Sequence, residues 1–381
     1  MKIALLSYST KPRGGVVHTL ALAEALTAQG QDVTVWTLGR DEDTGFFRPV
    51  DPGVQQRVVP FPPDPTEAVG PRILRSIQTL GKAFEPERYD IVHAQDCISA
   101  NAVERCVRTV HHLDHFITPE LVACHEKAIV RPFAHVCVSP AVAEDVEAGW
   151  GIRPVVIPNG VAADRFEAAE GSASAESWRR QLGRYVLAVG GIEPRKGSLD
   201  LLESFALLRE PDLRLVIAGG ETLFDYHDYR QRWEQRAHEL GIKPIVLGPV
   251  AHDDLPGLVA GAAAFAMPST KEGFGLAGME ALAAGVPVVA RDLPVLRDLF
   301  GDVAWLAHEP TGLAHGLRDR LRNTDVERKQ AGRERARSYT WHAAAHAHLH
   351  LYESLQASGK GLHRMTASNR KSPEPPYTGT A

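Results

Sequence analysis

Two glutamates stand eight positions apart around a glycine-bearing turn. The segment from Glu272 to Glu280 reads Glu-Gly-Phe-Gly-Leu-Ala-Gly-Met-Glu, and the helix-forming Ala-Leu-Ala-Ala follows directly. We expect Glu272 in a loop and Glu280 on the helix, both facing one crevice. Glycines in such a loop allow backbone N–H groups at a helix N-terminus to approach an anion such as a phosphate. A sugar nucleotide offers hydroxyls to the two acids and phosphates to the amides.

The residues on either side of this segment favour a strand, loop, helix and strand in that order. Ala-Phe-Ala-Met-Pro-Ser is typical of a buried strand that ends at Pro268, and Gly285 marks a helix end before Val-Pro-Val-Val-Ala. Charged side chains usually stay in water, so the alternative is that both glutamates lie on a solvated helix face. The agreement of the flanking features favours a functional site.

In this setting the Glu-x7-Glu segment resembles that of retaining glycosyltransferases with the GT-B fold, family four (glycosyl transferases group 1) in particular. The resemblance implies front-face transfer from a nucleotide-sugar donor, in which the acceptor attacks from the side that the diphosphate leaves. It implies that Glu272 binds sugar hydroxyls and that Glu280 holds the ribose diol. It also implies that the backbone amides of Phe274, Gly275 and Leu276 contact the donor.

A basic pair, Arg195 and Lys196, follows a predicted strand in Val-Gly-Gly-Ile-Glu-Pro-Arg-Lys-Gly. Cleavage of a sugar–diphosphate bond leaves negative charge on the phosphate, and positioned cations stabilise that charge as it develops. We expect both side chains to bind the diphosphate, with a solvated basic loop as the alternative. Many family members have an Arg directly after the first glycine of this segment, where this chain has Gly191. The identity of the nucleotide therefore stays open.

A glycine pair, Gly14 and Gly15, follows the first predicted strand in Lys-Pro-Arg-Gly-Gly-Val-Val-His. Both glycines allow close backbone contact, and the helix expected from Val16 adds the positive end of its dipole. The resemblance implies that this loop approaches the donor phosphate or the acceptor. The segment lacks the Gly-x-Gly-x-x-Gly spacing of dinucleotide folds, which counts against a dehydrogenase.

His111 ends the predicted strand Val-Arg-Thr-Val-His, so it should emerge at the carboxyl end of that strand. The resemblance places a catalytic histidine here, near the transferred sugar, and leaves the neighbours His112, Asp114 and His115 for the acceptor. Imidazole and carboxylate are also metal ligands, so a metal site is the alternative. Consecutive side chains on an extended chain point in different directions, which disfavours such a site.

The composition bounds the class of protein. A chain of 381 residues suits about two domains, and a net charge of −5 argues against a nucleic-acid partner bound through a general positive field. No run of about 18 apolar residues and no signal-peptide pattern occur, so we expect a cytoplasmic location. We expect no cofactor and no need for a divalent metal, because no Asp-x-Asp-type site stands out. Scattered spacing predicts buried, reduced thiols at Cys97, Cys106, Cys124 and Cys137.

Strands alternate with helices along the chain, which predicts an α/β fold with parallel sheets. Met1–Ser7, Val16–Ala28 and Asp32–Leu38 form one strand–helix–strand unit, whose crossover places the glycine turn at the carboxyl edge of the sheet. The pattern starts again at Tyr185. Two Rossmann-like, doubly wound domains facing across a cleft describe the GT-B fold, and ligands then bind between the carboxyl ends of the sheets.

We predict an N-terminal acceptor domain over residues 1–165 and a C-terminal nucleotide-sugar donor domain over 166–340. A helix over 341–358 should return to the first domain with its histidines exposed, and a disordered tail should occupy 359–381. Phe166–Trp178 has a weak apolar pattern and is expected to be the interdomain linker. Acceptor choice is expected in the loops Thr44–Val69 and Leu113–Lys127, and the turn with Asn159 and Gly160 is expected beside a hinge.

The stretch from Arg72 to Lys82 predicts a basic amphipathic helix. Related enzymes approach anionic membranes with such helices, so peripheral contact with the inner face of the membrane is one interpretation. Packing of Ile73, Ile77 and Leu80 on the first sheet explains the same pattern. Three cations are modest by the usual polybasic standard.

The leading hypothesis is a retaining glycosyltransferase that moves a sugar from a nucleotide-diphosphate sugar to a small molecule, glycan or lipid. Fold alone does not settle function, so two alternatives stay open. A nucleotide-sugar epimerase of the same fold would bind the same donor, but it should show further acid–base residues around the sugar. A non-catalytic nucleotide-sugar-binding module would not need the basic pair and both glutamates, although Gly191 leaves room for it.

Overall fold

A computed structural model describes the chain over residues 1–40, 43–64, 66–113, 119–220, 226–323 and 325–358. The tail predicted for 359–381 lies outside the described residues, as do Asp114 and His115.

The first sheet has seven strands in the order β3-β2-β1-β4-β5-β6-β7, and every paired neighbour is parallel. Strand β1 lies between β2 and β4, and its apolar run from Ile3 to Leu6 is fully buried, as expected for a strand with helices on both faces. The strands are β1 (Lys2–Leu6), β2 (Asp32–Arg40), β3 (Gln55–Phe61), β4 (Ile91–Ala94), β5 (Val107–Val110), β6 (Ala134–Cys137) and β7 (Val155–Val156).

Two helices of the first domain, α3 and α5, begin with a side-chain cap. Asp96 accepts from the Ser99 N–H at the start of α3, and Ser139 caps α5, which has Pro140 at its first position. The helices are α1 (Gly14–Ala28), α2 (Val69–Ala83), the short η1 (Pro86–Arg88), α3 (Cys97–Ala102), α4 (Pro119–Val130) and α5 (Pro140–Trp150).

The second sheet has six strands in the order β10-β9-β8-β11-β12-β13, again with parallel pairs throughout. Its strands are β8 (Arg184–Val189), β9 (Leu213–Ala218), β10 (Ile245–Gly248), β11 (Ala264–Met267), β12 (Val288–Arg291) and β13 (Trp305–Ala307). Its helices are α6 (Ala163–Glu167), α7 (Ala173–Leu182), η2 (Pro194–Lys196), α8 (Ser198–Ala206), α9 (His227–Glu239), α10 (Leu255–Gly261), α11 (Leu276–Ala283), α12 (Pro294–Phe300), α13 (Pro310–Arg322) and α14 (Val326–Arg337). The prediction of two doubly wound parallel-sheet domains is confirmed.

Strand β3 lies inside the segment that the sequence assigned to an acceptor loop. It begins with three exposed polar residues, Gln55, Gln56 and Arg57, and it contains Pro60. These features fit an edge strand, because an edge leaves one side without a hydrogen-bonded neighbour and can carry proline. The residues of β3 do not alternate between apolar and polar, so this strand was not predicted from the sequence.

The prediction of an interdomain linker at Phe166–Trp178 is wrong. Phe166 and Ala175 are fully buried, and they pack in the second domain with Tyr185 and Leu258. The segment contributes α6 and α7 to that domain. Its many alanines and serines gave a weak apolar pattern, because small side chains pack closely without a strong hydrophobic signal.

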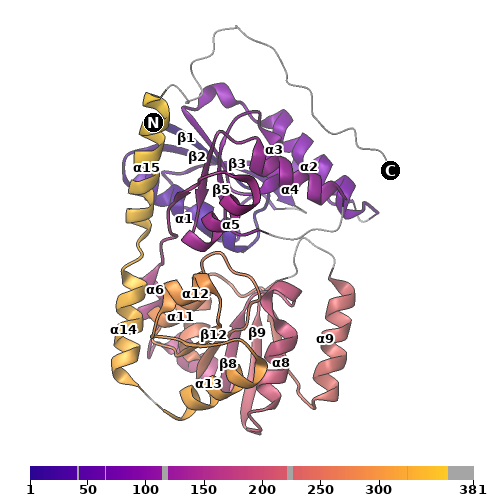
Figure 1. The fold of residues 1–381 in the computed structure, drawn as a ribbon, viewed down its shortest axis with the longest axis vertical. Coiled ribbons are helices and arrows are strands. Elements are labelled where there is room, and N and C mark those ends of the chain that lie inside the picture. Colours follow the sequence, from indigo (N-terminus) through magenta and orange to yellow (C-terminus); the bar gives the residue numbers. More distant parts are fainter. Residues whose placement is uncertain (41–42, 65, 114–118, 221–225, 324, 359–381) are drawn as a thin grey trace.

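Helix α15 (Trp341–Ala357) returns to the first domain, where it runs beside the sheet and contacts α1 (Figure 1). Ala345 and Tyr352 are buried there with Leu20. The expectation that its histidines are exposed holds for three of them, but it is wrong for His348, which is fully buried.

The chain passes between the domains twice, and the two passages touch. Val161 donates its N–H to the Tyr339 carbonyl at 2.9 Å. A Cβ at Gly160 would lie 2.3 Å from the backbone nitrogen of Trp341, so only glycine allows this approach. The turn predicted beside a hinge therefore lies at the point where both passages meet.

The apolar side of α2 is occupied within its own domain. Ile73, Ile77 and Leu80 pack against neighbouring elements, and the helix contacts α3 and α4. This arrangement supports packing as the reason for the pattern, and peripheral membrane contact stays a prediction. In the part of the chain that the structure describes, no helix is long and apolar enough to cross a membrane.

The four cysteines are free thiols, as predicted, and three are buried while Cys97 is half-buried. Burial raises the pKa of Cys106 and of Cys137 to about 12, so both are protonated at neutral pH.

Candidate active site

The main residues of the site lie in the two loops that follow neighbouring strands of the second sheet. β8 and β11 pair in parallel; η2 follows the first and the loop before α11 follows the second. Thr270 donates its N–H to the Arg195 carbonyl at 2.8 Å. Gly197 has a left-handed φ of 63°, and a Cβ there would lie 2.0 Å from the Pro268 carbonyl oxygen. The two loops are thus fixed against each other through backbone contacts.

Glu272 lies at the centre of this junction. Lys196 Nζ donates to its Oε1 at 2.5 Å, Ser269 Oγ donates at 2.9 Å, and Arg195 Nη1 lies 3.8 Å away. Burial by itself would raise the pKa of Glu272, but Lys196 and Arg195 outweigh it and lower the pKa to about 2. Glu272 is therefore ionised at neutral pH, and the structure brings it together with both predicted cations.

The two cations are anchored. Arg195 Nη2 donates to Glu193 at 2.9 Å, and that carboxylate is itself buried. The Lys196 stem crosses Gly190, where a Cβ would lie 3.2 Å from its Cε. About a quarter of each cationic side chain is exposed, 24% for Arg195 and 23% for Lys196. The geometry does not fit the alternative of a freely solvated basic loop.

The glycine turn of the motif begins helix α11. Gly275 has a left-handed φ of 81° and occupies the N-cap position, directly before Leu276. Phe274 is buried, with its ring 5.5 Å from that of Tyr339 in an edge-to-face contact. Burial of this ring holds the backbone of the turn in place. The first amides of α11 can then face an anion, as predicted for the donor phosphates.

Glu280 lies on α11 in a different environment from Glu272. Burial raises its pKa to about 8, and the only opposing influence is the charge of Arg165 on α6. Among the residues that the structure describes, none donates a hydrogen bond to its carboxylate. Glu280 is therefore mostly protonated at neutral pH and can donate a hydrogen bond. Arg165 was not expected at the site, because it lies in a segment without a motif.

The site reaches the first domain at His111, directly after β5. A Cβ at Gly273 would lie 1.6 Å from the His111 carbonyl oxygen, so the first glycine of the motif packs on the His111 backbone. On its other side, the His111 ring lies 3.6 Å from the position of a Cβ at Gly15. Gly14 is exposed and its Cβ position is open. The predicted histidine therefore lies between the motif loop and Gly15.

Histidines that the sequence did not assign to the site lie behind His111. The His18 ring is 4.8 Å from the His111 ring, and its Nδ1 is 2.9 Å from Asn159 Oδ1. An amide oxygen only accepts, so Nδ1 of His18 carries the proton. Burial, followed by the charge of His348, lowers the pKa of His18 to about 3. Burial also holds the pKa of His111 well below its ordinary value, so both rings are neutral at pH 7. His18 lies one helical turn after Gly14 and Gly15, and this position in the sequence could have assigned it to the site.

A metal centre is not formed by the described residues, since none of their His, Cys, Asp and Glu side chains gather in a group of three suited to an ion. The alternative that includes Asp114 and His115 falls outside the described residues. The expectation that no metal is needed stays a prediction.

Comparisons with known proteins agree with this architecture. Residues 12–165 match the model of Glycosyltransferase Family 4, and residues 174–339 match that of Glycosyl transferases group 1. The chain is 30% identical to phosphatidyl-myo-inositol mannosyltransferase of Mycobacterium tuberculosis, over 94% of this chain and 98% of the relative. It is 27% identical to D-inositol 3-phosphate glycosyltransferase of Corynebacterium jeikeium, over 96% and 100%.

Among solved structures, the chain is similar to the Anabaena protein HepE in complex with UDP-glucose. The TM-score is 0.71 at 20% identity, over 93% of this chain and 100% of that protein. The chain therefore belongs to the group 1 glycosyltransferases, an enzyme family, and has the GT-B fold.

Proposed function

We propose that this enzyme moves a sugar, with retention of its anomeric configuration, from a nucleotide-diphosphate sugar to an acceptor bound by the first domain. One observation carries the proposal. Glu272 is held among Lys196, Arg195 and Ser269, and the next residue, Gly273, packs on His111 of the other domain. Donor cations, a sugar-binding acid and a first-domain histidine thus converge at one place.

The diphosphate would contact Arg195, Lys196 and the first amides of α11. Lys196 has three N–H donors and Arg195 has five, so each can bind a phosphate oxygen while it keeps its carboxylate partner. These cations would stabilise the negative charge that develops as the sugar–phosphate bond breaks. Gly191 supplies no further cation, so the contribution of the basic pair should be large in this chain.

The departing phosphate, not Glu272, would accept the proton of the acceptor hydroxyl. A carboxylate whose pKa is about 2 is a weak general base, and Glu272 is such a group. In the proposed step the bond from the anomeric carbon to the phosphate oxygen breaks. The acceptor oxygen bonds to the same face of that carbon, and the acceptor proton passes to the phosphate oxygen. Glu272 would orient the sugar hydroxyls, and Glu280 would bind the ribose diol.

A donor panel tests the proposal. Purified enzyme is incubated with UDP-, GDP- and ADP-sugars, and release of the nucleoside diphosphate is followed, with Glu272→Ala as the control. Because one relative carries a mannosyltransferase name and one structural neighbour was solved with UDP-glucose, GDP-mannose and UDP-glucose are the first donors. The names of the two curated relatives also suggest acceptors to test: myo-inositol, D-inositol 3-phosphate and vesicles containing phosphatidylinositol.

Each alternative predicts a different result in the same experiment. Retention requires the product linkage to keep the anomeric configuration of the donor, which proton NMR reads directly. An epimerase would change the sugar of the donor without release of the nucleoside diphosphate. A binding module would bind the donor in calorimetry and leave it intact with every acceptor, and that outcome would overturn the proposal.

A further inference from the structure

One arginine lies behind the point where the two active-site loops meet. Arg291 is the last residue of β12, the strand beside β11, and 11% of its side chain is exposed. Its Nη2 and Nε donate to the Pro268 carbonyl at 3.1 Å and 3.3 Å, and Nη2 also donates to the Asp200 carboxylate. Its Nη1 donates to the His308 carbonyl, which follows β13. One guanidinium group therefore contacts segments that follow three other strands of the second sheet.

Two of these partners belong to the segments that carry the site. Pro268 directly follows β11 and leads into the loop of Glu272. Asp200 lies in the first turn of α8, the helix that begins just after Lys196. Lys196 and Glu272 in turn contact each other at 2.5 Å. Arg291 thus contacts the segments on both sides of this ion pair.

The guanidinium group reaches the closest backbone contact between the two loops. A Cβ at Gly197 would lie 2.0 Å from the Pro268 carbonyl oxygen and 3.5 Å from Arg291 Nη2. The same carbonyl oxygen is thus approached by the Gly197 backbone and by two N–H groups of Arg291. Because a planar guanidinium presents its donors in a fixed fork, it defines the direction of that carbonyl more narrowly than a single ammonium group could.

The side chain of Arg291 is committed to protein groups. All three nitrogens of its guanidinium donate to such groups, and the Asp200 carboxylate supplies a counter-charge. Loss of one partner from a largely buried ion pair leaves the other charge unpaired, which is costly. Arg291 is therefore placed to orient the loops and not to bind the donor itself.

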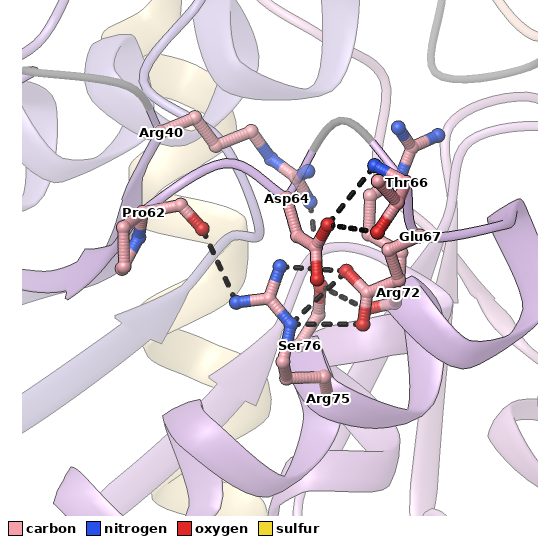
Figure 2. Close-up of polar contacts among 8 residues, drawn as sticks. All are labelled: Arg40, Pro62, Asp64, Thr66, Glu67, Arg72, Arg75 and Ser76. Carbon is pink, nitrogen blue, oxygen red and sulfur yellow. Dashed lines mark hydrogen bonds and ion pairs between the residues drawn. The ribbon is translucent and has the colours of Figure 1, made fainter.

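Another arginine with several hydrogen bonds shows how this arrangement differs from a local contact. Arg75 Nε and Nη2 donate to the Glu67 carboxylate at 2.9 Å and 2.6 Å, and Nη1 donates to the Pro62 carbonyl at 3.2 Å (Figure 2). These partners lie 8 and 13 positions away in the sequence, so Arg75 ties α2 to the segment just before it. The partners of Arg291 lie 17, 23 and 91 positions away. Arg291 therefore connects elements that only the tertiary fold brings together.

The separation of charged groups in an active site affects the rate strongly, by about 100-fold for a displacement of about 1 Å. We propose that Arg291 is a positioning residue for sugar transfer, which holds the loop of Glu272 against the start of α8 so that Lys196 and Glu272 keep their separation. Arg291 acts through Pro268 and Asp200 and does not touch the donor. This inference rests on the proposed function, because it assigns Arg291 to the site that the proposed reaction uses.

The opposite edge of the same sheet offers a matched control. Arg184 is the first residue of β8, and it donates to the Glu210 carboxylate and to the Leu321 carbonyl, both at 2.7 Å. It therefore makes the same two kinds of contact as Arg291, one with a carboxylate and one with a backbone carbonyl. Because the strands are parallel, the first residue of β8 lies at the edge away from the active-site loops.

Kinetics of the full-length enzyme test the inference. Arg291→Met removes the guanidinium group and keeps an unbranched side chain. We expect kcat for nucleoside-diphosphate release to fall about 10- to 100-fold while the KM of the acceptor stays unchanged, because the acceptor is proposed to bind the first domain. Arg184→Met should keep the wild-type kcat, although it also loses an ion pair and a carbonyl contact.

The rates are measured well below the thermal midpoint of each variant, so that a loss of stability alone would leave kcat unchanged. Arg291→Lys keeps the charge but not the fork, and its kcat should lie between those of Arg291→Met and wild type. This variant also carries the test if Arg291→Met does not fold. Wild-type kcat in the Arg291 variants, or an equal fall in Arg184→Met, would contradict the inference.

Amide hydrogen exchange, followed by mass spectrometry, needs no donor and so separates this inference from the proposed function. The Thr270 N–H donates to the Arg195 carbonyl and bridges the two loops. We expect peptides that cover residues 190–200 and 268–276 to exchange about 10-fold faster in Arg291→Met, because local opening becomes easier, and at the wild-type rate in Arg184→Met.

The two measurements distinguish the possible failures. If wild type cleaves no donor but exchange rises only in Arg291→Met, the proposed function fails and Arg291 still holds the loops. If donors are cleaved and Arg291→Met exchanges faster but turns over normally, the proposed function stands and the inference fails. A fall in kcat without faster exchange would also overturn the inference, because Arg291 would then act on the donor directly.

Discussion

The loop that carries Glu272 and the helix that carries Glu280 hold the same side chain under opposite electrostatic conditions. Two cations lower the pKa of Glu272 to about 2 in spite of its burial. Burial raises the pKa of Glu280 to about 8, with Arg165 as its only opposing charge. The comparison shows that the two ends of one motif are prepared for different tasks. Glu272 keeps a fixed charge, whereas Glu280 can give up or accept a proton near neutral pH.

The largest effect on the reaction rate is expected when the charge of Glu272, at the loop end of the motif, is removed. Glu272→Gln keeps the shape and the Ser269 contact but removes the charge that Lys196 and Arg195 share. We expect nucleoside-diphosphate release to fall by about 10²- to 10³-fold, comparable to the loss of one positioned group in a transition state. Single-turnover rates at saturating donor measure it. A variant with wild-type turnover would show that the charge of Glu272 has no part in transfer.

The contact between the loop and the first domain gives the next effect. Gly273→Ala would place a methyl group 1.6 Å from the His111 carbonyl oxygen, where backbone must move. We expect turnover to fall by roughly 100-fold, because a displacement of about 1 Å at a reacting group can cost that much. The rate and the thermal midpoint are measured together. Gly149→Ala, whose Cβ meets nothing within 4 Å, is the control and should behave as wild type.

A smaller effect is expected at the helix end. Glu280→Gln keeps a hydrogen-bond donor and acceptor near the proposed ribose position but removes the ionisable group. We expect the KM of the donor to rise about 10-fold or less with little change in kcat, since this contact should be the same in ground and transition states. Donor titrations at fixed acceptor separate the two constants. A fall in kcat with an unchanged KM would instead assign Glu280 to the chemical step.

The last expected effect is on stability, and its sign differs between the two glutamates. The pKa of Glu280 lies above its ordinary value of 4.5, so the unfolded chain loses this proton first and stability falls as pH rises from 4.5 to about 8. The pKa of Glu272 lies below that value, so its contribution is present above pH 4.5 and is lost as pH falls toward 2.

Urea unfolding near pH 5 and near pH 8 measures how each glutamate changes the free energy of unfolding. We expect Glu280→Gln to gain stability relative to wild type as pH rises, by at most about 1.4 kcal/mol per pH unit for one proton. Glu272→Gln should show no such gain across the same interval. Parallel pH profiles for wild type and Glu280→Gln would contradict the raised pKa.

The alternation of strands and helices was readable from the sequence because buried parallel strands are continuous apolar runs, as at Ile3 to Leu6. The edge strand β3 and the short helices α6 and α7 were not, since none of them carries a strong apolar period. At the site, Glu272, Lys196 and His111 could be singled out from motifs. The neutral state of His18 depends on side chains that the fold brings together, and no local pattern in the sequence encodes it.

The two adjoining passages between the domains have a mechanical meaning. The Val161 N–H bonds the Tyr339 carbonyl, and Gly160 lies against the backbone of Trp341, so the two connections are joined at one place. Few chain-terminal or loop residues need to change conformation when domains rotate about such a place. Rotation about it would separate Gly273 from His111 while α15 stays with the first domain. Such an opening is the motion that product release would require.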